Sequence, residues 1–102
     1  MAIHYFVYTD LGLTELERLL TPAAQAANGL WEAWRAHDDL SPFHEEIMQE
    51  YGVDRDFKTI ASCRHSKDHL GAAREATLAF FESLPGRKLL LNGDVFVAFR
   101  PE

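Results

Sequence analysis

The chain has 102 residues, of which 47% are hydrophobic and 12% aromatic, so it can build one hydrophobic core and is excluded from the disordered class. Its formal net charge of −6 argues against a nucleic-acid partner, because phosphate binding depends on clustered lysine and arginine. The single cysteine, Cys63, excludes an internal disulfide, and with neither an export leader nor a membrane span we expect one cytoplasmic domain over residues 1–102.

The first predicted element is a strand over residues 4–8. Its sequence, His-Tyr-Phe-Val-Tyr, is rich in aromatic and β-branched residues and is apolar on both faces. That pattern is typical of a strand covered on two sides. We therefore expect this strand to be central in its sheet.

A short helix is predicted next. Thr14 and Glu17 have the spacing of a capping box, in which the two side chains satisfy free backbone amides at a helix start. Thr21 and Pro22 then have the pattern of an N-cap followed by a first-turn proline. They predict an interruption and the start of a second helix, because proline disfavours a helix interior.

The second helix is expected to reach the two tryptophans. Trp31 and Trp34 are three residues apart and would share one helix face. The pair Asn28-Gly29 is also a strong turn signal. Two shorter helices, or a loop that opens onto the tryptophan helix, therefore stay open as alternatives.

Another helix is predicted over about 42–51. Ser41 and Pro42 again form a cap-plus-proline start, and Gly52 suits a left-handed helix stop. The helix would have two faces. Its apolar face holds Phe43, Ile47, Met48 and Tyr51, and its polar face holds Glu45, Glu46, Gln49 and Glu50.

A half-buried strand is predicted over residues 57–63, and the longest helix follows it. Ser66 is the expected cap of this helix, which runs to about Leu84 and ends at Pro85-Gly86. The strand alternates with Phe57, Thr59, Ala61 and Cys63 on one face. The helix carries an inner stripe of Leu70, Ala73, Thr77, Phe80, Phe81 and Leu84.

The C-terminal segment predicts a β-hairpin. Two apolar runs, residues 88–91 and 94–99, flank Asn92-Gly93, the usual signature of a type I′ turn. The full order is strand, two or three helices, strand, helix and hairpin. It predicts an α+β fold with about four strands in a mixed or mainly antiparallel sheet and helices packed on that sheet.

One candidate reactive cluster lies between the predicted strand and the long helix. Cys63 near a helix N-terminus and basic side chains has the setting of a reactive thiolate. Cys63, His65 and His69 are also weak candidates for metal ligands. The alternative, which we favour, is an inert buried thiol with no metal and no cofactor, because Cys63 shares a strand face with apolar residues.

Carboxylates next to histidines form a second candidate cluster. The runs are His37-Asp38-Asp39 and His44-Glu45-Glu46. Paired carboxylates support acid–base catalysis only if their environments separate their pKa values. Adjacent residues on a helix point in different directions, so we interpret these runs as solvated surface charge.

The acidity of the chain is concentrated in residues 38–56. This window contains one base, Arg55, and the remaining acids and bases of the chain balance. Carboxylates steer a basic partner and nearby aromatic rings anchor it, so the window with Trp31 and Trp34 predicts a partner-binding surface. The alternative is a solvated helix face and core tryptophans. The acids are Asp38, Asp39, Glu45, Glu46, Glu50, Asp54 and Asp56.

We therefore expect a non-enzymatic inhibitor of a basic protein. Its most concrete form is a bacterial immunity protein that occludes the cleft of a nuclease-type toxin, with carboxylates in place of phosphates. A second hypothesis is a small enzyme or ligand-binding domain that uses Cys63, His65 and His69. A third is a regulatory domain that forms a homodimer through its sheet face.

Overall fold

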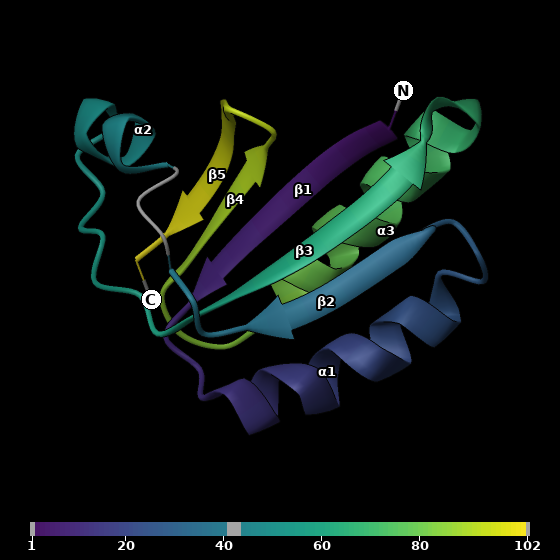
Figure 1. The fold of residues 1–102 in the computed structure, drawn as a ribbon, viewed down its shortest axis with the longest axis horizontal. Helices are drawn as coiled ribbons and strands as arrows, with labels where there is room; N and C mark the ends of the chain where they lie inside the picture. The colour runs from purple at the N-terminus through teal and green to yellow at the C-terminus, as the bar shows by residue number, and fades with distance from the viewer. Residues whose placement is uncertain (1, 41–43, 102) are drawn as a thin grey trace.

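A computed structural model of the chain describes residues 2–40 and 44–101. They form an α+β fold with one five-stranded antiparallel sheet and three α-helices, as predicted in class (Figure 1). The strands are β1 (Ala2–Thr9), β2 (Ala33–His37), β3 (Thr59–Ser66), β4 (Lys88–Asn92) and β5 (Val95–Arg100). The helices are α1 (Leu13–Ala26), α2 (Glu45–Glu50), the short 3₁₀ turn η1 (Lys67–His69) and α3 (Leu70–Ser83).

The strand order across the sheet is β2-β3-β1-β4-β5. β1 pairs with β3 on one side and with β4 on the other, with Val7 opposite both Ala61 and Leu90. The prediction of a central first strand is confirmed. Its two-sided burial explains its composition, because Val7 faces one core while Tyr8 faces the other.

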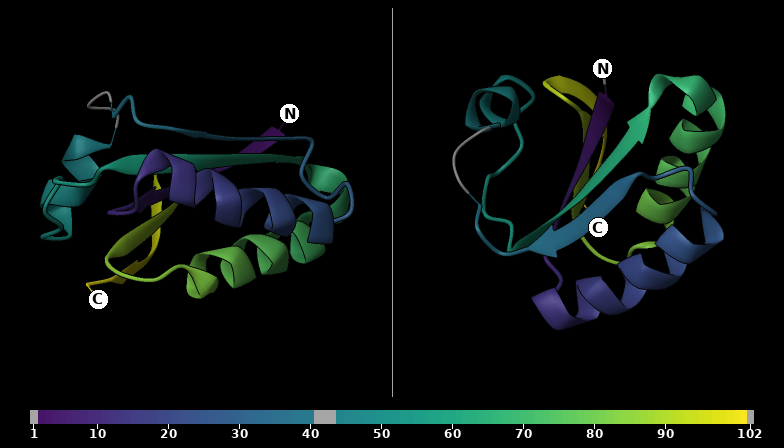
Figure 2. Two further views of the ribbon diagram at one scale, coloured as in Figure 1. Left: turned by 90° about the horizontal axis from the view of Figure 1, so that it is seen from below. Right: turned by 45° about the vertical axis from the view of Figure 1, so that its right-hand side comes forward.

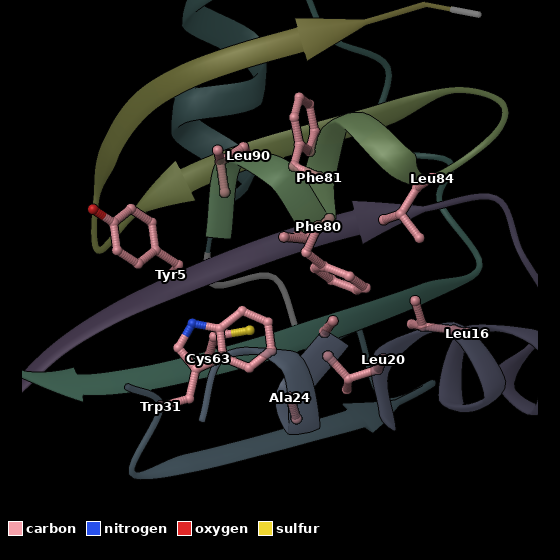
Figure 3. Close-up of a cluster of buried hydrophobic side chains, with 13 residues drawn as sticks. Tyr5, Leu16, Leu20, Ala24, Trp31, Cys63, Phe80, Phe81, Leu84 and Leu90 are labelled. Atoms are coloured by element: carbon pink, nitrogen blue, oxygen red, sulfur yellow. The ribbon is translucent and has the colours of Figure 1, made fainter. Parts of the chain in front are cut away.

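Helices α1 and α3 cover one face of the sheet, and α2 lies on the other side near β5 (Figures 1 and 2). The larger core fills the space between α1, α3 and the sheet (Figure 3). A smaller core lies under α2 and the segments around it. Its buried members are Tyr8, Met48, Val53, Phe57, Ile60, Leu89 and Leu91.

Helix α1 corrects two predictions. It begins at Leu13, so Thr14 lies inside its first turn and no capping box forms with Glu17 there. It also continues through Pro22. An interior proline costs about 3 kcal/mol, but each buried leucine returns about 1.5–3 kcal/mol. The stripe of Leu16, Leu20 and Ala24 is buried on both sides of the exposed Pro22, so burial outweighs the missing hydrogen bond.

The expected tryptophan helix does not form. Asn28 and Gly29 take φ values of 50° and 83°, a left-handed pair that ends α1. Trp34 lies instead in β2, an edge strand that pairs with β3 and was not predicted. The segment has weak periodicity, and its strand conformation depends on the hydrogen bonds that β3 offers.

The second half of the chain follows the prediction with two corrections of side-chain direction. Ser66 caps η1, accepting a hydrogen bond from the Asp68 amide at 3.4 Å, and the stripe of α3 is buried except at Leu70, which is exposed. Phe57 precedes β3 and packs with Ile60 in the smaller core, away from the face of Ala61 and Cys63.

Two turns complete the fold. Helix α2 is shorter than expected, and the predicted Ser41-Pro42 start and Phe43 lie outside the described residues. Gly52 takes the predicted left-handed conformation with φ 68°. The hairpin forms, but Asn92 pairs with Val95, so its two-residue loop is Gly93-Asp94. Only Gly93 in that loop has positive φ, whereas type I′ needs positive φ at both positions.

Candidate functional site

His44 joins the start of α2 to the centre of the sheet. Its ring is buried, and its Nδ1 forms a hydrogen bond of 2.5 Å with the Tyr8 hydroxyl on β1. Burial raises the pKa of Tyr8 to about 12, so the hydroxyl keeps its proton in this contact. The ring also packs against Phe6, with 4.8 Å between ring centroids.

Burial also sets the charge of His44. It lowers the pKa of this histidine below its ordinary value of 6.5, while the Asp94 carboxylate and a backbone hydrogen bond at Gly93 oppose the shift. His44 Nε2 lies 3.9 Å from the Asp94 carboxylate, whose side chain is 92% exposed. An exposed carboxylate at that distance interacts weakly, so desolvation dominates and His44 is neutral at pH 7.

Two cavities adjoin the Tyr8–His44 pair. One has a volume of about 420 Å³ and is lined on its acidic side by Glu45, Asp54 and Asp56. The other has a volume of about 380 Å³ and is lined in part by Asp39 and Asp94. Tyr8, Leu40 and His44 border both cavities. Several carboxylates of the acidic window, 38–56, therefore gather on the α2 side of the sheet.

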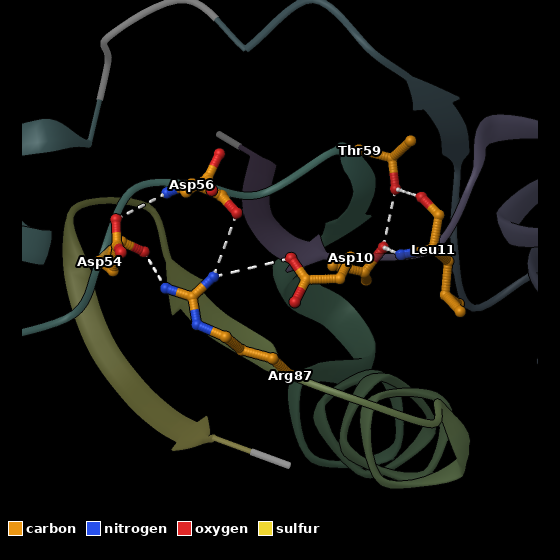
Figure 4. A network of polar contacts seen from close by, with 7 residues as sticks. Asp10, Leu11, Asp54, Asp56, Thr59 and Arg87 are labelled. Carbon is orange, nitrogen blue, oxygen red and sulfur yellow. Dashed lines mark hydrogen bonds and ion pairs between the residues drawn. The ribbon is translucent and has the colours of Figure 1, made fainter.

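Arg87 organises the loop that carries Asp54 and Asp56 (Figure 4). Its guanidinium donates hydrogen bonds to the main-chain carbonyls of both residues and lies 3.6 Å from the Asp10 carboxylate. It also lies 3.9 Å above the ring of Phe57. The Arg87 side chain is only 18% exposed. Because it binds carbonyls of the loop, the exposed side chains of Asp54 and Asp56 are not its partners.

The other arginine of this region pairs with one glutamate. Arg55 forms an ion pair with Glu45, and the Arg55 side chain is 67% exposed. The Asp54 carboxylate accepts a hydrogen bond of 3.1 Å from the Asp56 amide, which shapes the loop locally. Glu46 and Glu50 lie four residues apart on the exposed side of α2.

The same face of the sheet is not acidic throughout. Residues paired directly across an antiparallel ladder lie on one face, and His37 is paired with Ile60 of the smaller core. Strand alternation then places Arg35 and Arg64 on this face, further along β2 and β3. Both arginines are exposed. The negative charge is therefore local to α2 and its flanking loops.

The two tryptophans do not accompany the acidic window. Trp31 is buried in the larger core, where its Nε1 donates to the Thr77 hydroxyl at 3.0 Å. It is a core residue and is not available as an anchor. Trp34 is 42% exposed, but it pairs with Cys63 and so lies on the sheet face that α1 and α3 cover.

The Cys63 cluster is divided by the fold. Cys63 is fully buried, and burial raises its pKa to about 12, which opposes thiolate formation. His65 is buried beside the Tyr5 ring and donates from Nδ1 to the Ser66 carbonyl at 2.6 Å, whereas His69 is exposed. Within residues 2–40 and 44–101, no three His, Cys, Asp or Glu side chains gather as a metal site.

Tyr51 is a surface residue that the sequence pattern misassigned. The helical pattern placed it on the apolar face of α2, but its side chain is 54% exposed. It stacks on Phe96 of β5, with ring centroids 4.2 Å apart and an interplanar angle of 12°. The long sequence separation of the two rings explains why no local pattern indicated this stack.

These features define a small antiparallel α+β protein with an acid-rich segment on one side of its sheet. Residues 1–91 match the family model described as "CDI System Immunity Component". The chain therefore belongs to this family of immunity components of contact-dependent inhibition systems, and its partner is a toxin. No curated protein and no solved structure gives a significant match. None of the helices described here is long and apolar enough to cross a membrane.

Proposed function

We propose that this immunity component acts without catalysis and neutralises a basic, nuclease-type toxin by covering its active cleft with the acidic window. The carboxylates would then occupy positions that the phosphates of the nucleic acid take in the toxin. Asp38, Asp39, Glu46, Glu50, Asp54 and Asp56 are exposed. Clustered exposed charge of one sign raises the rate of encounter with a partner of opposite charge.

The proposal rests on which partners the arginines near the acidic window have. Arg87 binds main-chain carbonyls, and Arg55 pairs with Glu45. Glu46 and Glu50 project from α2 without being the partners of either arginine. Their charge is thus displayed to a partner, which is what inhibition by electrostatic complementarity needs.

The test is a double charge reversal, Glu46→Lys with Glu50→Lys. We expect the association rate with the toxin of the same contact-dependent inhibition system to fall about tenfold or more, because these charges steer the encounter. Raising the salt concentration should slow the association of the wild-type protein and narrow the difference in rate between wild type and variant. Stopped-flow or surface plasmon resonance at two salt concentrations measures both effects.

The matched control is Glu17→Lys with Glu75→Lys, which changes the net charge equally. These exposed glutamates lie on α1 and α3, on the other side of the sheet. Glu45 is left intact because a lysine there would face Arg55. If both double variants slow association equally, net charge alone explains the effect. If the α2 variant associates with the toxin at the wild-type rate, the proposal is refuted.

A further inference from the structure

Four large apolar side chains are exposed among the described residues, namely Trp34, Tyr51, Leu70 and Val95. Two of them, Tyr51 and Val95, lie where α2 meets the start of β5. We propose that the Tyr51 ring is the anchor of the toxin interface and that its open face receives an arginine side chain of the toxin. This inference rests on the proposed function and names the contact at its centre.

The geometry of the stack leaves one ring face free. Phe96 covers one face of Tyr51 in a nearly parallel arrangement, with an interplanar angle of 12°. The Tyr51 side chain nevertheless remains 54% exposed. A guanidinium is attracted to the face of a tyrosine ring and prefers to lie parallel to it.

The ring is also held in place before any partner arrives. Phe96 packs against the smaller core, so the stack fixes Tyr51 to the sheet. His44 and Asp94 make a second contact between the start of α2 and the hairpin. A side chain that is already ordered loses little conformational entropy on binding, which is typical of interface anchors.

The charge of the segments around the stack favours a cationic side chain on the open face of Tyr51. Segments 44–54 and 92–97, which meet at the stack, contain no lysine or arginine. Their acids are Glu46, Glu50, Asp54 and Asp94, together with Glu45, which is paired with Arg55 next to the first segment. An exposed aromatic ring in segments rich in carboxylates suits an arginine, which can stack on the ring and pair with a carboxylate at once.

Substitutions of Tyr51 separate a ring-face contact from simple apolar contact. With the toxin of the same inhibition system, we expect Tyr51→Leu to raise Kd about tenfold or more, as for an interface anchor. Tyr51→Phe, which keeps the ring and loses the hydroxyl, should stay within about threefold of wild type. Isothermal titration calorimetry measures both, and the matched control Trp34→Leu should bind like wild type.

Nitration of the wild-type protein gives a test that needs no variant. The chain has three tyrosines, and Tyr5 and Tyr8 are buried, so Tyr51 is the reactive one. We expect tetranitromethane to nitrate Tyr51 in the free protein and saturating toxin to protect it. An unprotected Tyr51 in the complex would refute the anchor even if Tyr51→Leu failed to fold.

The outcomes also separate this inference from the proposed function. If Glu46→Lys with Glu50→Lys slows association but Tyr51→Leu binds like wild type, the acidic surface stands and the anchor is wrong. If Tyr51→Phe loses as much affinity as Tyr51→Leu, the hydroxyl rather than the ring face makes the contact. If neither set of variants changes binding, both proposals fail.

Discussion

His44 is the residue on which the attachment of α2 most directly depends. It forms a hydrogen bond with Tyr8, contacts Phe6 and approaches Asp94, so one side chain links α2, β1 and the hairpin. Its neutral form fits this setting because only the uncharged ring can be buried at low cost. Protonation would keep the shape of the ring but place a charge in the smaller core.

Stability should therefore fall on mild acidification. The folded pKa of His44 lies below its ordinary value of 6.5, so the unfolded chain binds the proton more readily. The stabilising contribution is complete above about pH 6.5 and is lost as the pH falls toward the lowered folded pKa. Urea unfolding of wild type and His44→Gln between pH 7.5 and 5 measures the free energy of unfolding at each pH. This free energy should depend less on pH in the variant than in wild type. Parallel curves would contradict this expectation.

At the scale of elements, α2 and its loop are held by a few specific side chains. The helix has six residues, and only Met48 within it is buried. Arg87, at the start of the hairpin, compensates by binding two carbonyls of the loop and covering Phe57. The two arginines of the region thus have different roles, since Arg55 pairs only at the surface.

Arg87→Met should destabilise the protein more than Arg55→Met does. Loss of Arg87 leaves carbonyls and the Asp10 carboxylate without their cation, which we expect to cost about 1–3 kcal/mol of the free energy of unfolding. Loss of Arg55 removes an exposed ion pair, which is worth about 0–1 kcal/mol. Denaturant titration of the two variants measures the difference. An equal loss of unfolding free energy in both variants would show that Arg87 does not hold the loop in place.

At the scale of the whole molecule, stability is concentrated in the middle of the sheet. β1 is paired on both sides, and both sheet faces of the β1–β4 region are buried. β2 and β5 are edge strands, and half of the amides in an edge strand point away from the sheet. Local opening should therefore begin at the edges and at α2.

Native-state hydrogen exchange should show this gradient. We expect the slowest amides in β1 and in the parts of β3 and β4 that pair with it, near Val7, Ala61 and Leu90. Amides of β2 and α2 should exchange orders of magnitude faster, because they open without global unfolding. Protection of β2 equal to that of β1 would indicate that its outer edge is covered by another chain.

Elements with local signals could be predicted from the sequence. A two-sided apolar run predicted the central β1, Ser66 predicted the start of η1 and α3, and two apolar runs predicted the hairpin. The acidic excess of residues 38–56 also indicated an inhibitor, and the family match supports an immunity component. Periodicity, caps and charge are carried by neighbouring residues, so they can be read along the chain.

The residues that surround the acidic segment depend on how distant parts of the chain pack together. β2 forms because β3 offers it a ladder, and that pairing turns Trp34 to the face opposite α2. Trp31 is buried through contact with Thr77, 46 residues away, and Tyr51 is held at the surface by Phe96. These placements depend on contacts between distant segments, and burial depends on what covers a side chain, which no local pattern records.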